Sequence, residues 1–292
     1  MSFDASAVRR SFQQAASRYE DFDWLQWEVA QRLIEQPQLN DFQPQCIVDV
    51  GCGTGRLTAA LKQRWPKAQV LGMDFAPAMA QQTRRRSKWR RPIETVCGDL
   101  GALPIATRSV DLLICNLALQ WNNDIEAVFN GWRRVLKPGG LLLFSSFGPD
   151  TLQELRAAWA AVDGQAHVSE FADLLQVGDW LMGSGYRDPV MSGETITATY
   201  ADPMDLMREL KGLGAHNHDQ RRARGLTGKA AFAHMREAYK RFYQDGRAPA
   251  TWEIVYGAAW GPEEGQPVRS GGGEVATFSV EALRQSRNKR NG

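Results

Sequence analysis

IVDVGCGTGRLT, residues 47–58, joins a short apolar run to three closely spaced glycines. The apolar run is typical of a parallel strand that is buried on both faces. Such a strand delivers its carboxyl end to the crevice in which open α/β sheets bind ligands. Gly51, Gly53 and Gly55 let the backbone turn and approach a ligand without a clash from Cβ atoms. The stretch therefore predicts a ligand-binding loop between a strand and a helix.

The spacing of the glycines and of one acid predicts the kind of ligand. A dinucleotide fingerprint reads G-x-G-x-x-G/A, but here the third glycine comes one residue early and Arg56 stands at the last position. The sequence also lacks the phosphate-binding pattern G-x-x-x-x-G-K-[ST]. Both departures favour a nucleoside cofactor without a phosphate. Asp74, nineteen residues after Gly55, is expected to accept both ribose hydroxyls, although it can instead cap the helix expected from Pro77.

Strand and helix patterns alternate along the chain. Apolar strands separated by helices predict a parallel sheet covered on both faces, that is, an α/β, Rossmann-like fold. Strands are expected at 46–50, 69–73, 93–97, 110–116, 141–146, 190–200 and 251–260. Helices are expected at 7–36, 57–65, 79–87, 125–136, 151–162, 171–182, from Asp202-Pro203, and at 230–243.

We expect a single domain over 1–292. Its parts are an N-terminal helical cap at 1–43, a cofactor-binding core at 44–200, a helical, basic lid insertion at 201–249, a last strand at 250–260, and a loop and tail at 261–292. The stretch 261–273 is rich in Gly, Pro and Ser, which is typical of a loop.

The composition is that of an ordinary globular protein. Of the 292 residues, 43% are hydrophobic and 23% charged, and the net charge of +2 requires neither nucleic acid nor membrane as a partner. No apolar stretch approaches the ~18 residues of a membrane helix, so we expect a cytoplasmic protein, and a monomer. The four cysteines, at 46, 52, 97 and 115, form no C-x-x-C pair and are expected to be buried, reduced thiols. The histidines lack a metal-ligand spacing, so no metal is expected.

Five ordered signals resemble the class I S-adenosylmethionine-dependent methyltransferases. They are Val48-Asp49-Val50-Gly51-Cys52-Gly53-Thr54-Gly55, Asp74, Gly98-Asp99-Leu100, the stretch 111–116, and Leu136-Lys137-Pro138-Gly139-Gly140. The resemblance implies a seven-stranded sheet with one antiparallel strand, in which 201–249 is inserted before the last strand. It also implies S-adenosylmethionine as the cofactor and S-adenosylhomocysteine as the product.

The same resemblance implies the cofactor-binding residues. The first motif supplies Asp49, Gly51, Gly53 and Gly55, and Asp74 holds the ribose. Asp99 is expected near the adenine amino group, with Leu100 packed on the ring, and Asn116 near the methionine moiety.

The acceptor is predicted from what the fourth strand lacks. Asn116-Leu117-Ala118-Leu119 stands where amine-methylating enzymes place N/D-P-P-Y/F, and Cys115 has neither a proline nor a base beside it. The sequence contains no Ser-His-Asp or Cys-His arrangement either. A carboxylate acceptor is already ionised and needs no base, because positioning and the exclusion of water supply most of the acceleration. The sequence therefore favours carboxyl O-methylation.

The insertion is basic, with ten Lys and Arg against six Asp and Glu across 201–250. Its stretch KGLGAHNHDQRRARGLTGK, 211–229, is interrupted by glycines. This pattern predicts a lid that meets an acidic partner and closes over the cofactor. The alternative is a solvated helical face without a partner.

Further stretches resemble a narrower family, the malonyl-acyl-carrier-protein O-methyltransferases of biotin synthesis. They are 12–19, Leu119-Gln120-Trp121-Asn122, 144–152, 210–217, 225–228 and 251–257. The family implies methyl transfer to the free carboxylate of a malonyl thioester on acyl carrier protein, with malonyl-CoA as the other possible substrate. Loss of that charge would let the acyl chain enter fatty-acid elongation as a disguised primer for pimeloyl synthesis.

Acceptor-side roles follow from position. Tyr19 is expected to close over the methyl group, although its ring can instead be core packing. Gln120, Trp121 and Phe147 follow strand ends and are expected to wall the acceptor side. The carrier protein and its phosphopantetheine phosphate are expected to meet Arg221, Arg222, Arg224 and Lys229.

Three other functions stay open. The stretch RRRSKWRR, 84–91, has six basic residues and a tryptophan, which fits an RNA or DNA methyltransferase or merely a solvated basic turn. A module that binds the cofactor without turnover would keep the first motif and Asp74. A methyltransferase for a small free acid would share the chemistry but would not need the basic insertion.

Overall fold

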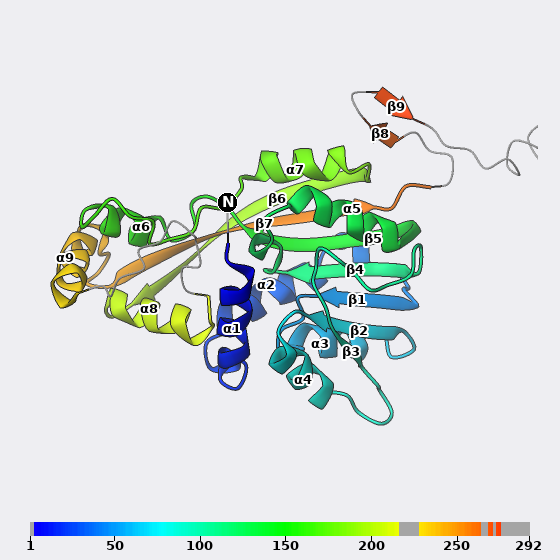
Figure 1. Cartoon of the computed structure of the whole chain (residues 1–292), viewed down its shortest axis with the longest axis horizontal. Helices are drawn as coiled ribbons and strands as arrows, with labels where there is room; N and C mark the ends of the chain where they lie inside the picture. Colours follow the sequence, from blue (N-terminus) through cyan, green and yellow to red (C-terminus); the bar gives the residue numbers. More distant parts are fainter. Residues whose placement is uncertain (1–2, 216–227, 264–267, 271–272, 276–292) are drawn as a thin grey trace, which may run out of the picture.

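The computed structural model describes residues 3–215, 228–263, 268–270 and 273–275. Its centre is a seven-stranded sheet in the order β3-β2-β1-β4-β5-β7-β6 (Figure 1). The strands are β1 (Cys46–Val50), β2 (Gln69–Asp74), β3 (Glu94–Cys97), β4 (Val110–Asn116), β5 (Leu136–Phe147), β6 (Arg187–Tyr200) and β7 (Ala248–Trp260). β7 is antiparallel to β5 and β6, and the other pairs are parallel. The predicted α/β sheet with one antiparallel strand is confirmed.

Helices cover both faces of the sheet. They are α1 (Ala5–Ala15), α2 (Trp24–Ile34), α3 (Arg56–Arg64), α4 (Pro77–Arg85), α5 (Ile125–Val135), α6 (Gln153–Ala160), α7 (Leu174–Gly183), α8 (Pro203–Gly212) and α9 (Lys229–Tyr239), with short 3-10 turns η1 (Tyr19–Asp21), η2 (Pro37–Leu39), η3 (Leu119–Trp121) and η4 (Lys240–Phe242). Neighbouring residues of β1 point to opposite faces: Ile47 packs with α2 and α3, whereas Val48 packs with α5 and α7. Because both faces are apolar, the strands appear in the sequence as continuous hydrophobic runs.

The N-terminal segment is two helices, and the prediction of one helix over 7–36 is wrong. α1 and α2 are separated by η1. The two apolar lines of this segment bury against different partners. Ala16 packs in a small cluster with Met79, whereas Leu25 and Val29 pack in the large cluster under the sheet. One straight helix cannot reach both clusters, so the chain turns between them.

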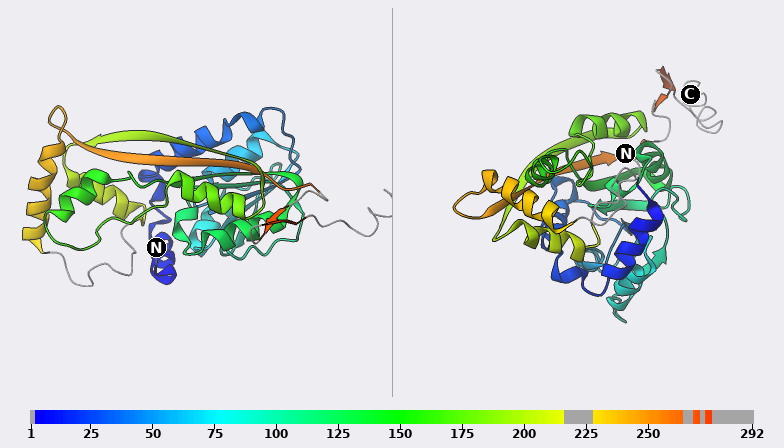
Figure 2. Two further views of the ribbon diagram at one scale, coloured as in Figure 1. Left: turned by 90° about the horizontal axis from the view of Figure 1, so that it is seen from above. Right: turned by 60° about the vertical axis from the view of Figure 1, so that its left-hand side comes forward.

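β6 and β7 run past the parallel strands, and α6, α8 and α9 lie around their far end (Figures 1 and 2). α8 begins with Pro203 at its first turn, where the missing N–H of proline costs nothing. The carboxylate of Asp202 accepts a hydrogen bond from the N–H of Met204 at 2.8 Å. The helix predicted to begin at Asp202-Pro203 is therefore confirmed.

Two smaller predictions are wrong. Within 261–273, where a loop was expected, Val268–Ser270 forms strand β8, which pairs antiparallel with β9 (Gly273–Val275), because the pairing satisfies backbone groups that a loop would leave to water. Cys97 is exposed, unlike Cys52 and Cys115, because it ends the edge strand β3. No helix in the described ranges is long and apolar enough to cross a membrane.

Gly257 in β7 keeps the antiparallel strand in close contact with β5. Gly257 lies opposite Phe144, and a Cβ atom on it would stand 2.2 Å from the Phe144 ring. That ring is fully buried and contacts Phe129 at a centroid distance of 5.2 Å, so it cannot move alone.

We expect Gly257→Ala to lower the free energy of unfolding by about 1–3 kcal/mol, because the core has no room for another methyl group. Urea denaturation measures the change. The matched control is Gly183→Ala, whose added Cβ would meet no atom within 4 Å. Equal unfolding midpoints for the two variants would contradict the packing.

Candidate functional site

The glycine loop is joined to the end of β2 by backbone hydrogen bonds. The N–H groups of Gly51 and Cys52 both donate to the carbonyl of Met73, at 2.8 and 3.0 Å. Gly51 has a φ of +73°, and a Cβ atom on it would stand 2.3 Å from Cβ of Ala118. Position 51 therefore requires glycine for two reasons, its left-handed backbone and its close approach to Ala118, two residues after β4.

Asp74 lies at the end of β2 and holds the loop from the other side. One of its carboxylate oxygens accepts from the N–H of Gly53 at 3.0 Å, and the other from Ala76 at 2.8 Å. Burial raises the pKa of Asp74 to about 6, against the effect of these two hydrogen bonds. Ala76, not Asp74, is the N-cap of α4, and its side chain makes no capping bond. The carboxylate thus binds the loop and is not merely a helix cap.

Asp49 lies beneath the same loop, in β1. Its side chain is buried, and it accepts a hydrogen bond from the hydroxyl of Thr58 at 2.5 Å. Burial raises the pKa of Asp49 to about 7, the charge of Asp74 raises it further, and the bond from Thr58 opposes the rise. Gly55, the last glycine of the loop, has a φ of +82° and leaves no room for a Cβ atom against Thr83.

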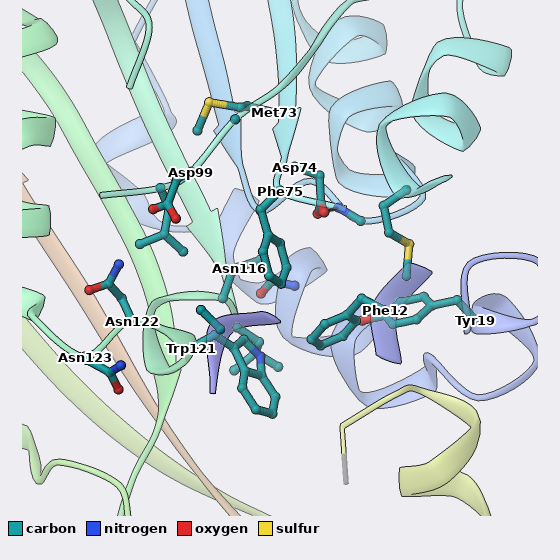
Figure 3. A pocket seen from close by; sticks show the side chains of 18 of the residues that line it. Phe12, Tyr19, Met73, Asp74, Phe75, Asp99, Asn116, Trp121, Asn122 and Asn123 are labelled. Atoms are coloured by element: carbon teal, nitrogen blue, oxygen red, sulfur yellow. Dashed lines mark hydrogen bonds between the residues drawn. The ribbon is translucent and has the colours of Figure 1, made fainter. Parts of the chain in front are cut away.

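A cavity of about 200 Å³ opens beside the loop, at the carboxyl ends of β1, β2 and β4 (Figure 3). Six of the predicted cofactor-binding residues line it: Gly51, Gly53, Asp74, Asp99, Leu100 and Asn116. A Cβ atom on Gly53 would meet nothing within 4 Å, so this part of the loop presents bare backbone. The fold therefore brings together residues that are 65 positions apart in the chain.

Asp99 and Asn116 differ in how they are held. Asp99 is exposed to the cavity, and its carboxylate accepts from the N–H of Gly101 at 2.7 Å. The amide nitrogen of Asn116 donates to the carbonyl of Gln26 at 2.8 Å, and its oxygen accepts from the Ser145 hydroxyl at 2.8 Å. Asn116 thus ties β4 to β5 and α2, which fixes the position of the cavity wall.

Aromatic side chains cover the cavity on the side of α1. Phe12 is their centre: its ring lies 5.5 Å from Trp121, 6.0 Å from Phe75 and 6.5 Å from Tyr19, and all four line the cavity (Figure 3). Burial raises the pKa of the Tyr19 hydroxyl, and the carboxylates of Asp23 and Asp74 add to the rise. Tyr19 therefore stays a neutral O–H donor. Phe75 was missed in the sequence, where its only signal is its place directly after Asp74.

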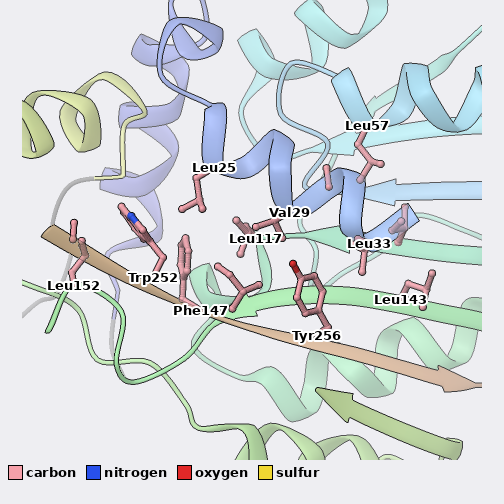
Figure 4. Packing of buried hydrophobic residues seen from close by; sticks show 14 of the residues in the cluster. Leu25, Val29, Leu33, Leu57, Leu117, Leu143, Phe147, Leu152, Trp252 and Tyr256 are labelled. Carbon is pink, nitrogen blue, oxygen red and sulfur yellow. The ribbon is translucent and has the colours of Figure 1, made fainter. Parts of the chain in front are cut away.

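The other predicted acceptor-side and carrier-binding residues either do not line the cavity or lie outside the described part. Gln120 is buried and donates to the carbonyl of Leu117 at 2.7 Å. Phe147 packs against Phe171 and Trp252 in the large core cluster, each at 5.5 Å between ring centroids (Figure 4). Neither lines the cavity. Lys229 is exposed at the start of α9. Arg221, Arg222 and Arg224 lie outside the described residues.

A second, smaller cavity of about 50 Å³ adjoins the first and shares Tyr19, Gly51, Gly53 and Asn116 with it. Its walls carry three side chains that sequence reasoning missed: Gln26, Asp23 and Trp27. Oε1 of Gln26 is buried and has no hydrogen-bond partner among the described residues. Arg56 pairs with Asp23 at 2.5 Å and stacks on Trp27 at 4.4 Å. The one signal in the sequence was Arg56, which departs from the dinucleotide fingerprint.

The charges of the two cavities suit a ligand with cationic and hydroxyl groups. The carboxyl groups of Asp49 and Asp74 are buried beside the loop, and the amide oxygen of Gln26 has no hydrogen-bond partner among the described residues. At Gly53 the loop itself presents backbone that no side chain covers. The described residues contain no group of three or more His, Cys, Asp or Glu arranged to hold a metal ion.

Comparisons with known proteins agree with this geometry. A family model described as "Methyltransferase domain" matches residues 48–144. The chain is 45% identical over 288 residues to the malonyl-[acyl-carrier protein] O-methyltransferase of Halorhodospira halophila, covering 98% of this chain and 97% of that protein. It is 44% identical over 283 residues to the protein of that name from Xylella fastidiosa, covering 96% of each.

Solved structures show the same fold. The YcgJ protein from Bacillus subtilis aligns with a TM-score of 0.58 at 17% identity, over 81% of this chain and 99% of that one. A putative methyltransferase from Bacillus halodurans aligns with a TM-score of 0.58 at 16% identity, over 80% of this chain and 99% of that one.

The raised pKa of Asp49 predicts a pH dependence of stability in the ligand-free protein. An unfolded Asp loses its proton near pH 4, whereas folded Asp49 keeps it to about pH 7, so the folded state binds more protons in between. Raising the pH through this window lowers the free energy of unfolding. We expect Asp49→Asn to remove the share due to Asp49, at most about 4 kcal/mol, while keeping an acceptor for Thr58.

Urea unfolding at pH 5 and pH 8 measures most of this difference, because pH 5 lies near the acidic end of the window and pH 8 lies above its upper end. Exposed Asp41 supplies the control variant, Asp41→Asn. The same loss of stability between the two pH values in Asp49→Asn and in the unchanged protein would contradict the assignment.

Proposed function

Because the chain belongs to the malonyl-[acyl-carrier protein] O-methyltransferase family, we propose that it methylates the free carboxylate of a malonyl thioester on acyl carrier protein, using S-adenosylmethionine. The observation that carries the proposal is 45% identity to a relative of that name along 98% of this chain. Methylation removes the charge that distinguishes the malonyl group from an apolar acyl primer. The reaction would thereby start the synthesis of the pimeloyl chain of biotin.

The residues around the two cavities fit this cofactor. The carboxylate of Asp74 has lone pairs beyond those that accept from Gly53 and Ala76, and these can accept both ribose hydroxyls. Asp99 and Leu100 line the same cavity and would hold the adenine. The unpaired Oε1 of Gln26 suits the ammonium group of the amino-acid end. Arg56 has N–H donors beyond its bond to Asp23 and suits the carboxylate.

The chain needs no catalytic base for this reaction. When bound, S-adenosylmethionine supplies a methyl group on a positively charged sulfur. The sulfur keeps the electron pair of the C–S bond that breaks, and a carboxylate oxygen of the acceptor forms the new C–O bond of the ester. Phe12, Tyr19 and Trp121 exclude water from the cavity, so opposite charges meet without a hydration shell. The Tyr19 O–H, kept protonated by burial, can orient the acceptor.

The wall around the acceptor is held from behind. Gln120 donates to the carbonyl of Leu117, and Leu117 lines the cavity next to Trp121. Phe147, the last residue of β5, packs in the same core cluster as Leu117. We assign these two residues to positioning the wall, in place of the direct contact expected from the sequence.

The proposal predicts where a labelled methyl group goes. We expect label from S-adenosylmethionine on malonyl-carrier protein, and its release by mild alkali because the product is an ester. Malonyl-CoA, a free dicarboxylic acid and bulk RNA serve as parallel acceptors. Alkali-stable label on RNA, or transfer to the free acid alone, would refute the proposed substrate.

Asp74 offers a test of the cofactor site. We expect Asp74→Asn to weaken S-adenosylmethionine binding about 10- to 100-fold, because an amide offers one acceptor oxygen where the carboxylate offers two. Isothermal titration calorimetry measures the affinity, and Asp41→Asn is the control. A variant that folds normally and binds the cofactor as tightly as the unchanged protein would show that Asp74 serves the loop alone.

A further inference from the structure

A groove of about 410 Å³ lies between α1 and the end of α8, apart from the two cavities described above. On the α1 side it is lined by Ser11, Gln14 and Ala15, which share one face of the helix, and by Arg18 in the turn that follows α1. On the α8 side it is lined by Arg208 and Lys211. The ring of Phe22 also lines it.

Two glycines make this groove possible. Gly212 packs on the Phe22 ring, and a Cβ atom there would stand 2.4 Å from it. Gly214 has a φ of +74° and lies against the backbone of Ser11, where a Cβ atom would stand 2.9 Å from the carbonyl oxygen. The end of α8 therefore approaches the N-terminal segment as closely as backbone allows (Figure 1).

The close approach places three cations around one groove. Arg18, Arg208 and Lys211 are all exposed. Arg18 pairs with Asp21 at 3.5 Å, and Arg208 pairs with Asp205, but these are exposed pairs of weak energy. Lys211 has no ion pair with any other residue in the described ranges. The groove thus combines an aromatic floor with a basic rim, the usual anatomy of a protein-docking surface.

The groove and the methyl-transfer cavity share one wall. Phe12 and Tyr19 point from the α1–η1 segment into the cavity, whereas Ser11 and Arg18, their neighbours in the chain, line the groove. The thickness of one helix, about 10 Å, therefore separates the two. A partner held at the groove would sit beside the aromatic cover of the cavity.

We propose that this groove docks an acidic face of the carrier protein while the malonyl arm enters the cavity. The proposal rests on the proposed function. It takes Arg208 and Lys211 from the basic insertion that the sequence predicted to meet an acidic partner, and it adds the α1 side of the groove, which the sequence did not point to. An acidic protein is favoured over a free phosphate because the three cations are spread along the rim of the groove, two on α8 and one in the turn after α1, and surround an aromatic floor instead of converging on one point.

The test reverses the two charges on α8 with Arg208→Glu/Lys211→Glu. Fluorescence anisotropy measures the Kd of labelled malonyl-carrier protein for the intact enzyme, and steady-state assays give KM for malonyl-carrier protein and for malonyl-CoA. We expect Kd and KM for the carrier protein to rise about tenfold or more, with less than about a twofold change in KM for malonyl-CoA. The neutral variant Arg208→Gln/Lys211→Gln should weaken binding less than the charge reversal. It introduces no new negative charge beside Asp205, so any loss of binding in it cannot come from charge repulsion within α8.

The matched control is Arg85→Glu/Arg90→Glu. It reverses two exposed charges, at the end of α4 and in the connection between α4 and β3, where Lys88 and Arg91 form a β-bridge. This connection extends away from α8 (Figure 1). Carrier-protein affinity should be unchanged in this control. Equal weakening of carrier-protein binding in the two charge-reversed proteins would mean that only the overall charge of the enzyme attracts the carrier protein. That result would overturn the proposal of a docking site.

Other results overturn it as clearly. An equal rise in KM for malonyl-CoA would identify the groove as a phosphate site. Tighter binding of bulk RNA than of carrier protein, lost in the α8 variant, would identify it as a nucleic-acid site. If the unchanged protein binds malonyl-carrier protein but methylates no malonyl thioester, the proposed function fails, and the anisotropy comparison still decides the role of the groove.

Discussion

The site depends on the junction between the end of β1 and the end of β2. Two loop N–H groups converge on the carbonyl of Met73, and a third donates to Asp74. These bonds require a backbone that turns through positive φ at each of the three glycines, which side chains would obstruct. Contacts of Gly51 with Ala118 and of Gly55 with Thr83 then position the β4 and α4 sides of the cavity relative to the same junction.

This junction brings two carboxyl groups together where little water reaches them. Asp49 and Asp74 are buried, and burial raises the pKa of each. Burying such groups costs folding free energy, which is common where proteins bind ligands. A positively charged ligand beside these carboxylates favours their ionised forms. The sulfonium and ammonium groups of the proposed methyl donor supply that kind of charge, so binding and the protonation of the site are linked.

The N-terminal segment joins the cover of the cavity to the outside of the molecule. Its inner side contributes Phe12 and Tyr19 to the cavity, and Asp23 ties it to Arg56 at the start of the first core helix. Its outer side forms the groove with α8. Because one short segment contacts both the cavity and this groove, a partner bound in the groove would press on the same packed residues that cover the cavity.

The sequence by itself predicted the sheet, the glycine loop and Asp74 beside it, because strand periodicity and glycine spacing are local properties of the chain, whereas Asp99 was implied by the family resemblance. It did not determine the break between α1 and α2, the pairing of Arg56 with Asp23, or the unpaired oxygen of Gln26. It also assigned Gln120 and Phe147 to the acceptor wall, whereas neither residue lines the cavity: Gln120 donates to the carbonyl of Leu117, and Phe147 packs in the core. A residue pattern specifies which side chains are apolar or charged, but the side of a wall that each one faces depends on packing between distant segments. Only the tertiary structure decides that.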